Sequence, residues 1–371
     1  MRPFVHTSLP VRVIFGEGTR ASLGVEIERL GCRRALVLTT PGQRAAAEAQ
    51  AISDSLGSLA AGVFAGAVMH TPVDVTERAL GVLRECGADC VVALGGGSTI
   101  GLGKALALRT GVAQIAVPTT YAGSEMTPVL GQTENGVKTT QRTLDVLPET
   151  VIYDVELTLA LPPRVSGVSG MNAIAHAVEA LYARDGTPLT SLMAEESIRA
   201  LAGALPRIAS APADRAARTA ALYGAWLAGA CLGAVGMALH HKLCHVLGGS
   251  FDLPHAETHT VILPHAVAYN AAAAPDAMAR VARAIGGSGG GENAAQGLYD
   301  LSGRLGAVRS LSDLGMPEAA IDRAADLAVK DPYWNPAPIR RDAVRALIVR
   351  AWAGDPPRAV GPGDEPAAVP T

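Results

Sequence analysis

The densest group of side chains that could do chemistry lies in LHHKLCHVLGGSFDLPHAETHT, residues 239–260. Five of the nine histidines in the chain fall there: His240, His241, His245, His255 and His259. Imidazole nitrogens donate hydrogen bonds, transfer protons near neutral pH and bind transition metals. The segment therefore indicates a metal site or a catalytic site, and the alternative is a set of polar residues in a helical core.

The spacing predicts that several of these side chains converge. His241 and His245 are four residues apart, and so are Asn172 and His176 in VSGMNAIAHAVEALY, which places each pair on one helix face. His255 follows in a predicted loop. A lone histidine on an apolar face is most often a satisfied core residue, but two such pairs with a loop histidine favour a functional site.

A second candidate site is the glycine-rich turn VVALGGGST, residues 91–99. After a buried strand, the start of a helix carries Gly95, Gly96, Gly97 and Ser98. Consecutive glycines let backbone N–H groups approach an anion, and a helix N-terminus favours phosphate. The turn is not a Walker loop, because Ala105 follows Lys104, and Ile100 replaces the last glycine of the G-x-G-x-x-G motif. We expect a phosphate cradle, with a plain tight turn as the alternative.

The segment PTTYAGSEMT, residues 118–127, offers hydroxyl groups where another strand ends. They belong to Thr119, Thr120, Ser124 and Thr127. Open parallel sheets bind nucleotides outside the carboxyl ends of their strands. The segment is therefore a second part of a predicted nucleotide site, although a capped turn without a ligand stays open.

These motifs lie on a regular alternation of strands and helices in the first 160 residues. Buried strands are predicted at residues 34–40, 59–66, 90–97, 114–120 and 150–157, and a hairpin at 127–143. Helical runs of suitable length separate the strands, which indicates right-handed βαβ units in a parallel sheet.

The strand signal stops after LPP at residues 161–163, and helical periodicity continues through residues 164–353. The fold class is therefore α/β followed by all-helical. We expect an α/β dinucleotide-binding domain over residues 1–161 and an all-helical catalytic domain over residues 162–354. Residues 355–371 are rich in proline and are predicted to be disordered.

The composition argues against several classes of partner. The chain is 49% hydrophobic and 18% charged with a net charge of −3, so we expect neither nucleic acid nor a membrane as a partner. The uncharged run Ala220–Leu239 has the length of a membrane span, but its many alanines and glycines favour a buried core helix. Five cysteines without a CxxC pair indicate reduced thiols and a cytoplasmic protein.

The chain resembles the iron-containing alcohol dehydrogenase superfamily, and within it the maleylacetate reductases, through five motifs in order: GGGS, PTT-x-AGSE, GMNAIAHAVEA, HHKLCHVLGG and LPHAETHTVILPH. The resemblance covers residues 8–353. It implies a dehydroquinate synthase-like architecture, in which a Rossmann-like parallel-sheet domain precedes an all-helical domain with the active-site cleft between them, usually in a homodimer. It also implies NADH- or NADPH-dependent reduction of the C=C bond of maleylacetate, a dicarboxylate, to 3-oxoadipate during aromatic-compound catabolism.

The resemblance places four metal-ligand positions on Asn172, His176, His241 and His255. The metal-dependent members have an aspartate where this chain has Asn172. Three imidazoles and an amide leave the charge of a divalent cation without compensation, although three histidines alone hold zinc in some enzymes. We therefore expect a vestigial site without metal, as in maleylacetate reductases.

The resemblance also suggests the remaining roles. The catalytic candidates, as N–H donors or proton sources, are His176, His241, His245 and His255, and His245 matches a histidine near the nicotinamide. Lys242 is expected to bind a substrate carboxylate, unless it is a solvated lysine on a helix face. The pyrophosphate is expected at Gly95, Gly96, Gly97 and Ser98. The nicotinamide half is expected at Thr119, Thr120 and Thr127, with Lys138 as a weaker candidate.

Thr40 bears on the choice between the two cofactors. NAD-preferring relatives carry an aspartate at this position, which would repel a 2′-phosphate. Thr40 removes that repulsion, and nearby Arg44 could attract the phosphate. We therefore expect both NADH and NADPH to be used.

Four competing functions remain at this point. A metal-dependent alcohol or polyol dehydrogenase is disfavoured by Asn172, and a lyase of the dehydroquinate synthase type by the histidine spacing. A nucleotide-sensing protein without catalysis would not need so many clustered histidines. A metallohydrolase lacks a general-base carboxylate within the cluster, where Glu257 is the closest.

Overall fold

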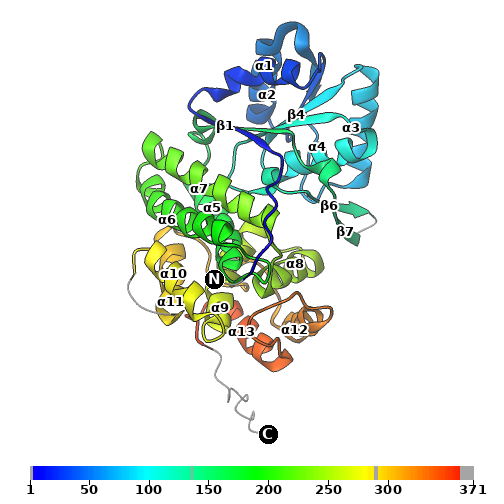
Figure 1. The fold of residues 1–371 in the computed structure, drawn as a ribbon. Helices are drawn as coiled ribbons and strands as arrows, with labels where there is room; N and C mark the ends of the chain where they lie inside the picture. The colour runs from blue at the N-terminus through cyan, green and yellow to red at the C-terminus, as the bar shows by residue number, and fades with distance from the viewer. Residues whose placement is uncertain (1–2, 135–136, 288–290, 360–371) are drawn as a thin grey trace. The chain divides into compact units, whose positions relative to one another are not determined.

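The computed structural model describes residues 3–134, 137–287 and 291–359 (Figure 1). The chain divides into two compact units: an α/β unit over Ser8–Leu161, and a helical unit that contains the chain from Pro162 onward with the segment up to Thr7. Each unit has its own hydrophobic core and is described by itself.

The α/β unit is built on a sheet with the strand order β1-β8-β5-β4-β2-β3, in which all described pairings are parallel. The strands are β1 (Arg12–Gly16), β2 (Ala35–Leu38), β3 (Ala60–Phe64), β4 (Cys90–Gly95), β5 (Ala113–Pro118) and β8 (Thr150–Asp154). The five predicted strands are confirmed. The sequence pattern did not predict β1, because this half-exposed edge strand lacks the continuous apolar run of a buried strand.

Helices cover both faces of this sheet: α1 (Leu23–Arg29) and α2 (Gln43–Leu56) lie on one face, and α3 (Val73–Glu85) and α4 (Gly97–Thr110) on the other. Alternate residues of β2 enter the two cores, since Val37 packs with α1 and α2 while Leu36 and Leu38 pack with α3 and α4. This is the two-residue period of a strand buried on both faces. The Rossmann-like parallel sheet is confirmed.

A two-stranded antiparallel hairpin follows β5. Strand β6 (Val129–Glu134) pairs with β7 (Val137–Arg142), so that Leu130 lies opposite Gln141. The hairpin prediction is confirmed, although residues 135–136 between the two strands lie outside the described residues.

The helical unit consists of helices joined by loops: α5 (Pro163–Tyr182), α6 (Pro188–Ser210), α7 (Arg215–Ala234), α8 (Leu239–Phe251), α9 (His255–Asn270), α10 (Pro275–Ala284), α11 (Gly291–Arg304), α12 (Ile321–Val329) and α13 (Arg341–Ala353). Helix α5 is buried along nearly its whole length, and α6, α7 and α9 pack against it. Prolines in the first turns of α5 and α6 suit a helix start, where the missing N–H costs nothing. The prediction that strands give way to helices is confirmed.

The uncharged run Ala220–Leu239 is not one helix, which corrects the prediction. Helix α7 ends at Ala234, α8 begins at Leu239, and the two helices meet at 94°. Gly236 interrupts the helix, and its N–H donates to the Asp185 carboxylate at 3.1 Å. Within the described ranges no single helix is long and apolar enough to cross a membrane, and α7 and α8 meet the length and composition criteria only when joined across their bend.

The predicted disordered tail falls mostly outside the described residues. Residues 355–359 are irregular, and the structure does not describe residues 360–371. The cysteines all lie in the described part, and all five are free thiols.

Candidate active site

Helix α5 carries three polar side chains along one buried side. Asn172, His176 and Glu179 are spaced so that they follow one another along a helix face, and each is at most 4% exposed. The rest of the helix is mostly small or apolar and packed on all sides. The surrounding core therefore fixes the positions of these three groups.

Glu179 has no role in the sequence-based prediction, yet it anchors the histidine segment. Helix α8 has Ala238 as its N-cap residue, which offers no side chain for the first N–H groups. The Glu179 carboxylate accepts the N–H groups of Ala238 and His240 at 2.6 and 2.8 Å. Burial raises the pKa of Glu179 to about 7, and these donors oppose the shift. The carboxylate thus caps α8 from a different helix.

A hydrogen-bonded chain runs from Glu179 through His241 to His176. Nδ1 of His241 lies 2.8 Å from Oε2 of Glu179, and its Nε2 lies 2.8 Å from Nδ1 of His176. Burial lowers the pKa of His241 to about 3, so its ring is neutral. Oε2 of Glu179 is an acceptor in this network, since it also accepts the N–H of Ala238. Nδ1 of His241 therefore carries the proton and Nε2 accepts the N–H of His176. Both nitrogens of His241 are therefore engaged inside the protein.

A second buried pair lies beside this chain. Nε2 of His240 is 2.9 Å from Nδ1 of His259 and 3.7 Å from Sγ of Cys244. Burial lowers the pKa of both histidines and raises that of the thiol. These three donor atoms lie within 4.8 Å of one another, but the bond between the two rings occupies a lone pair that a metal ion would need. The rings of His241 and His259 are 5.0 Å apart, which joins the two pairs in one cluster.

His245 and Lys242 occupy the outer side of α8. The His245 ring lies 6.1 Å from that of His241, but unlike His241 it is exposed. Its Nδ1 is 3.0 Å from the hydroxyl of Tyr333, and Nζ of Lys242 lies 5.7 Å from the centre of the Tyr333 ring. Among the predicted histidines, His245 is therefore the best placed to meet a small molecule from solvent.

His255 stands at a helix start and not in a loop, which corrects the prediction. Helix α9 begins at His255, directly after its N-cap residue Pro254. Proline has a fixed φ and lacks an N–H, so it suits the turn that leads into a helix. His255 is half-buried, and its ring lies 4.3 Å from that of His259. It therefore joins the cluster through His259.

The four positions that the resemblance assigns to a metal do not form a charged cation site. Asn172 supplies a neutral amide, and its buried Oδ1 has no hydrogen-bond partner among the described residues. The hydrogen bond between His176 and His241 places a proton where two lone pairs would have to face an ion. Glu179, the carboxylate in contact with this set, holds the other nitrogen of His241. The residues therefore do not fit the implied metal, and we assign it no chemical step.

The glycine-rich turn has the backbone that phosphate binding requires. Gly95 ends β4 with a φ of +152°, and a Cβ there would lie 2.5 Å from Oγ1 of Thr99. A Cβ on Gly96 would lie 2.9 Å from Oγ1 of Thr120. Helix α4 starts at Gly97, where an added Cβ meets open space, and its N-cap Gly96 offers no side-chain cap. The first N–H groups of α4, including that of Ser98, can therefore turn toward an anion.

The predicted threonines fall into two groups. Thr119 and Thr120 are half-buried just after β5, and the N–H of Thr119 donates to the carbonyl of Gly95 at 3.1 Å. Thr127 is buried, and its hydroxyl donates to the Ser124 carbonyl and accepts from the Lys104 ammonium. Thr127 therefore stabilises the turn at residues 124–127 through buried hydrogen bonds, whereas Thr119 and Thr120 lie beside Gly95 and Gly96.

Lys104 is a buried lysine to which the sequence-based prediction gave no role. Its Nζ lies 2.6 to 2.9 Å from four oxygens, which are the carbonyls of Ser124, Thr127 and Val129 and the hydroxyl of Thr127. Burial lowers the pKa of Lys104 to about 7, and the buried carboxylate of Glu125 opposes the shift. Lys104 thereby ties α4 to residues 124–129 and holds both halves of the predicted cofactor site together.

The remaining predicted cofactor residues lie on separate elements. Thr40 is half-buried shortly after β2, at the carboxyl edge of the sheet. Arg44 is exposed in α2, and its guanidinium donates to the carbonyl of Ala160 at 2.7 Å. Lys138 lies in β7 opposite Thr133, and its side chain falls outside the described part.

Comparison with known proteins decides the family. Residues 10–155 match the family model for iron-containing alcohol dehydrogenases, and residues 167–352 match the model for the C-terminal part of the same family. The chain belongs to the iron-containing alcohol dehydrogenase family. As a member of this family it is an oxidoreductase.

Several members of this family that are similar to the chain over nearly its whole length are maleylacetate reductases. The maleylacetate reductase of Rhizobium sp. (strain MTP-10005) is 58% identical over 357 residues, which cover 96% of this chain and 100% of that protein. The maleylacetate reductase of Burkholderia cepacia is 56% identical over 354 residues, covering 95% and 99%. The crystal structure of maleylacetate reductase from Agrobacterium tumefaciens matches with a TM-score of 0.91 at 58% identity, covering 96% and 100%.

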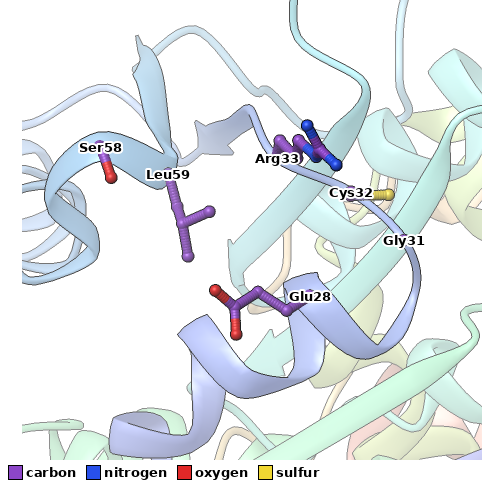
Figure 2. A pocket seen from close by; sticks show the side chains of 6 residues that line it. All are labelled: Glu28, Gly31, Cys32, Arg33, Ser58 and Leu59. Carbon is purple, nitrogen blue, oxygen red and sulfur yellow. The ribbon is translucent and has the colours of Figure 1, made fainter.

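A separate pocket lies at the amino-terminal ends of strands β2 and β3. It measures about 500 Å³, and Figure 2 shows Glu28 and Leu59 pointing toward one another across it. Its lining residues are Glu28, Gly31, Cys32, Arg33, Ser58 and Leu59. They precede β2 and β3, whereas the glycine turn follows the carboxyl end of β4. Ligands of open parallel sheets bind at the carboxyl ends, so this pocket is not part of the predicted cofactor site.

Two functional residues that the sequence-based prediction missed, Glu179 and Lys104, could have been found because each is a charged residue in an apolar run. Glu179 lies in the apolar run AHAVEA, where a carboxylate needs partners, and Lys104 is the one charge in GLGKALAL. Tyr333 gave no such signal, because it lies 88 residues from His245 in an irregular loop.

Proposed function

We propose that this oxidoreductase reduces the C=C bond of maleylacetate to 3-oxoadipate, with NADH or NADPH as the hydride donor. The observation that carries the proposal is the identity of 56–58% to maleylacetate reductases over at least 95% of the chain. The function belongs to the catabolism of aromatic compounds.

The chemistry requires charge stabilisation and one proton. Hydride from the nicotinamide adds to the carbon β to the ketone, negative charge develops on the ketone oxygen, and the α carbon then takes a proton. Fixed N–H donors stabilise such a charge because they need no reorganisation. We assign this contact to His245 and His255, the two cluster histidines that are not fully buried. His241 and His176 bond to each other and are assigned to positioning.

Lys242 is assigned to a substrate carboxylate. It is half-buried on α8, less than one turn before His245, and carries a formal positive charge beside the Tyr333 ring. Charge-assisted hydrogen bonds from an ammonium are strong contacts for a carboxylate. A dicarboxylate substrate supplies the matching negative charge.

The proposed reaction needs no metal. Asn172 contributes no charge, and the hydrogen bond between His176 and His241 supports a network of N–H donors in place of an ion. A divalent cation bound only by neutral ligands would keep its charge uncompensated in a buried site.

The cofactor is assigned to the α/β unit. The glycine turn with the N-terminus of α4 receives the pyrophosphate, and Thr119 and Thr120 flank the nicotinamide half. Thr40 leaves room for a 2′-phosphate, so both NADH and NADPH serve. A preference above about 1000-fold for either cofactor, roughly 4 kcal/mol, would contradict this part of the proposal.

We further propose that the protein is a homodimer in the cytoplasm, where NADH and NADPH are supplied. The family resemblance supports the dimer. Light scattering of the purified protein tests it, and a monomeric mass at micromolar concentration would contradict it.

The competing function is metal-dependent oxidation of an alcohol or polyol, which Asn172 disfavours. The test supplies the purified protein with NADH and maleylacetate, follows NADH absorbance and identifies the product by mass spectrometry. We expect one 3-oxoadipate for each NADH oxidised. Oxidation of simple alcohols with NAD⁺ and added iron or zinc, without turnover of maleylacetate, would favour the competing function.

A further inference from the structure

The loop between α12 and α13 is fixed to the end of helix α9. The side chains of Asn270 and Asn335 bond to each other through both amides, at 2.9 and 2.7 Å. The Tyr269 hydroxyl donates to the carbonyl of Pro338 at 2.7 Å. A side chain carried by this loop is therefore held in place by helix α9.

That loop presents Tyr333 to His245. The Tyr333 hydroxyl lies 3.0 Å from Nδ1 of His245, and the Lys242 ammonium lies 5.7 Å from the ring centre. Tyr333 is 37% exposed, so its side chain borders solvent. Burial raises the pKa of Tyr333, which keeps the hydroxyl protonated at neutral pH and able to donate.

The direction of this hydrogen bond decides what His245 can do. If the hydroxyl donates to Nδ1, the ring proton is on Nε2, which then presents an N–H donor. If the hydroxyl accepts from Nδ1 of a neutral ring, Nε2 presents a lone pair and cannot donate. A nearby ammonium favours a ring that bears developing negative charge, as on a tyrosine that gives up its proton.

We propose that Tyr333 is the positioning residue of His245, donating to Nδ1 so that Nε2–H faces the substrate, and that it relays a proton from solvent. The inference rests on the proposed function. When Nε2–H passes its proton to the α carbon, Nδ1 takes the hydroxyl proton of Tyr333, and one proton from solvent returns the pair to its starting state. No oxidation or reduction accompanies this proton transfer, because the hydride has already been delivered by the cofactor.

The first test reads the tautomer of His245 without substrate. Nitrogen-15 shifts of His245 are compared in the wild-type protein, in Tyr333→Phe and in the control Trp334→Phe, which alters the neighbouring exposed ring and keeps the hydroxyl. We expect a protonated Nε2 and an unprotonated Nδ1 in the wild type and the control, and a mixture of tautomers in Tyr333→Phe. A protonated Nδ1 in the wild type, or identical spectra in all three proteins, overturns the proposal.

The second test asks whether Tyr333 acts through His245. With maleylacetate and NADH, Tyr333→Phe should lower kcat about tenfold, or about 1.4 kcal/mol, with little change in either KM. In a His245→Ala background the same change should cost less than about twofold, because interacting residues are not additive. Equal losses in both backgrounds would show that Tyr333 acts independently of His245.

The two tests separate this inference from the function on which it rests. If the wild-type protein does not turn over maleylacetate, the proposed function fails, and the tautomer comparison still decides the Tyr333–His245 contact. If the wild type is active and Tyr333→Phe is equally active, the function stands and the inference fails.

Discussion

The glycine turn of the α/β unit and the histidine cluster of the helical unit are built from different parts of the chain. The turn offers main-chain N–H groups, shaped by Gly95 and Gly96, where no side chain fits. The cluster consists of side chains held by other side chains, such as His241 between Glu179 and His176. The glycine turn depends on the lack of side chains, and the histidine cluster depends on particular side-chain nitrogens and oxygens.

The two regions therefore tolerate different substitutions. A backbone site fails when a Cβ intrudes, whatever its chemistry, whereas a side-chain network fails when one donor becomes an acceptor. Lys104 is the exception in the α/β unit, because a side chain there holds the backbone of residues 124–129.

The largest effect is expected at this exception. Lys104→Met leaves four oxygens without their donor, so the free energy of unfolding should fall by about 3–5 kcal/mol. Urea denaturation measures this loss, with the exposed Lys330→Met as the matched control. A loss below about 1 kcal/mol would show that residues 124–129 keep their conformation without the Lys104 hydrogen bonds.

The next largest effect is expected at Glu179, which holds the histidine cluster in place. Glu179→Gln replaces an acceptor of three N–H groups by an amide that also donates, so the His241 tautomer is no longer fixed. We expect kcat for maleylacetate to fall about 100-fold with NADH affinity unchanged. Steady-state kinetics and fluorescence titration of NADH check this, with the exposed Glu318→Gln as control. A wild-type kcat in Glu179→Gln would show that the Glu179 carboxylate is not needed for turnover.

His265 shows what a buried histidine costs when it lacks partners. Neither ring nitrogen bonds within the described residues, and burial lowers its pKa to about 4. In the unfolded chain the His265 ring is protonated below about pH 6.5, whereas in the folded protein it stays neutral until about pH 4. The free energy of unfolding therefore falls as the pH falls from 6.5 toward 4. His265→Leu should therefore gain about 2 kcal/mol relative to the wild type between pH 7 and pH 5, at about 1.4 kcal/mol per pH unit. Urea curves at the two pH values measure it, and an equal difference at both would contradict the assigned pKa.

The smallest effect compares two glycines of the same turn. Gly97→Ala meets open space and should leave stability unchanged, yet its methyl group enters the volume assigned to the pyrophosphate and should weaken NADH binding about tenfold. Gly95→Ala should lose both stability and binding, because its Cβ collides with Thr99. Unchanged NADH affinity in Gly97→Ala would place the cofactor phosphates elsewhere.

The sequence predicted the backbone region better than the side-chain region. Buried apolar runs, the glycines after β4 and the change from strands to helices are local patterns, so they were readable. The edge strand β1, the cap that Glu179 gives to α8 and the contact of Tyr333 with His245 depend on partners more than 50 residues away. His255 was misplaced because the sequence around Pro254 suits a loop and a helix start equally well.

Whether the histidine cluster works without metal is tested by measuring maleylacetate turnover by protein dialysed exhaustively against a chelator, with its metal content determined in the same sample. We expect undiminished oxidation of NADH, because the proposed N–H donors, His245 and His255, stabilise the developing charge without a metal ion. Activity that disappears on dialysis and returns only with added iron or zinc would contradict it and would make Asn172 a working metal ligand.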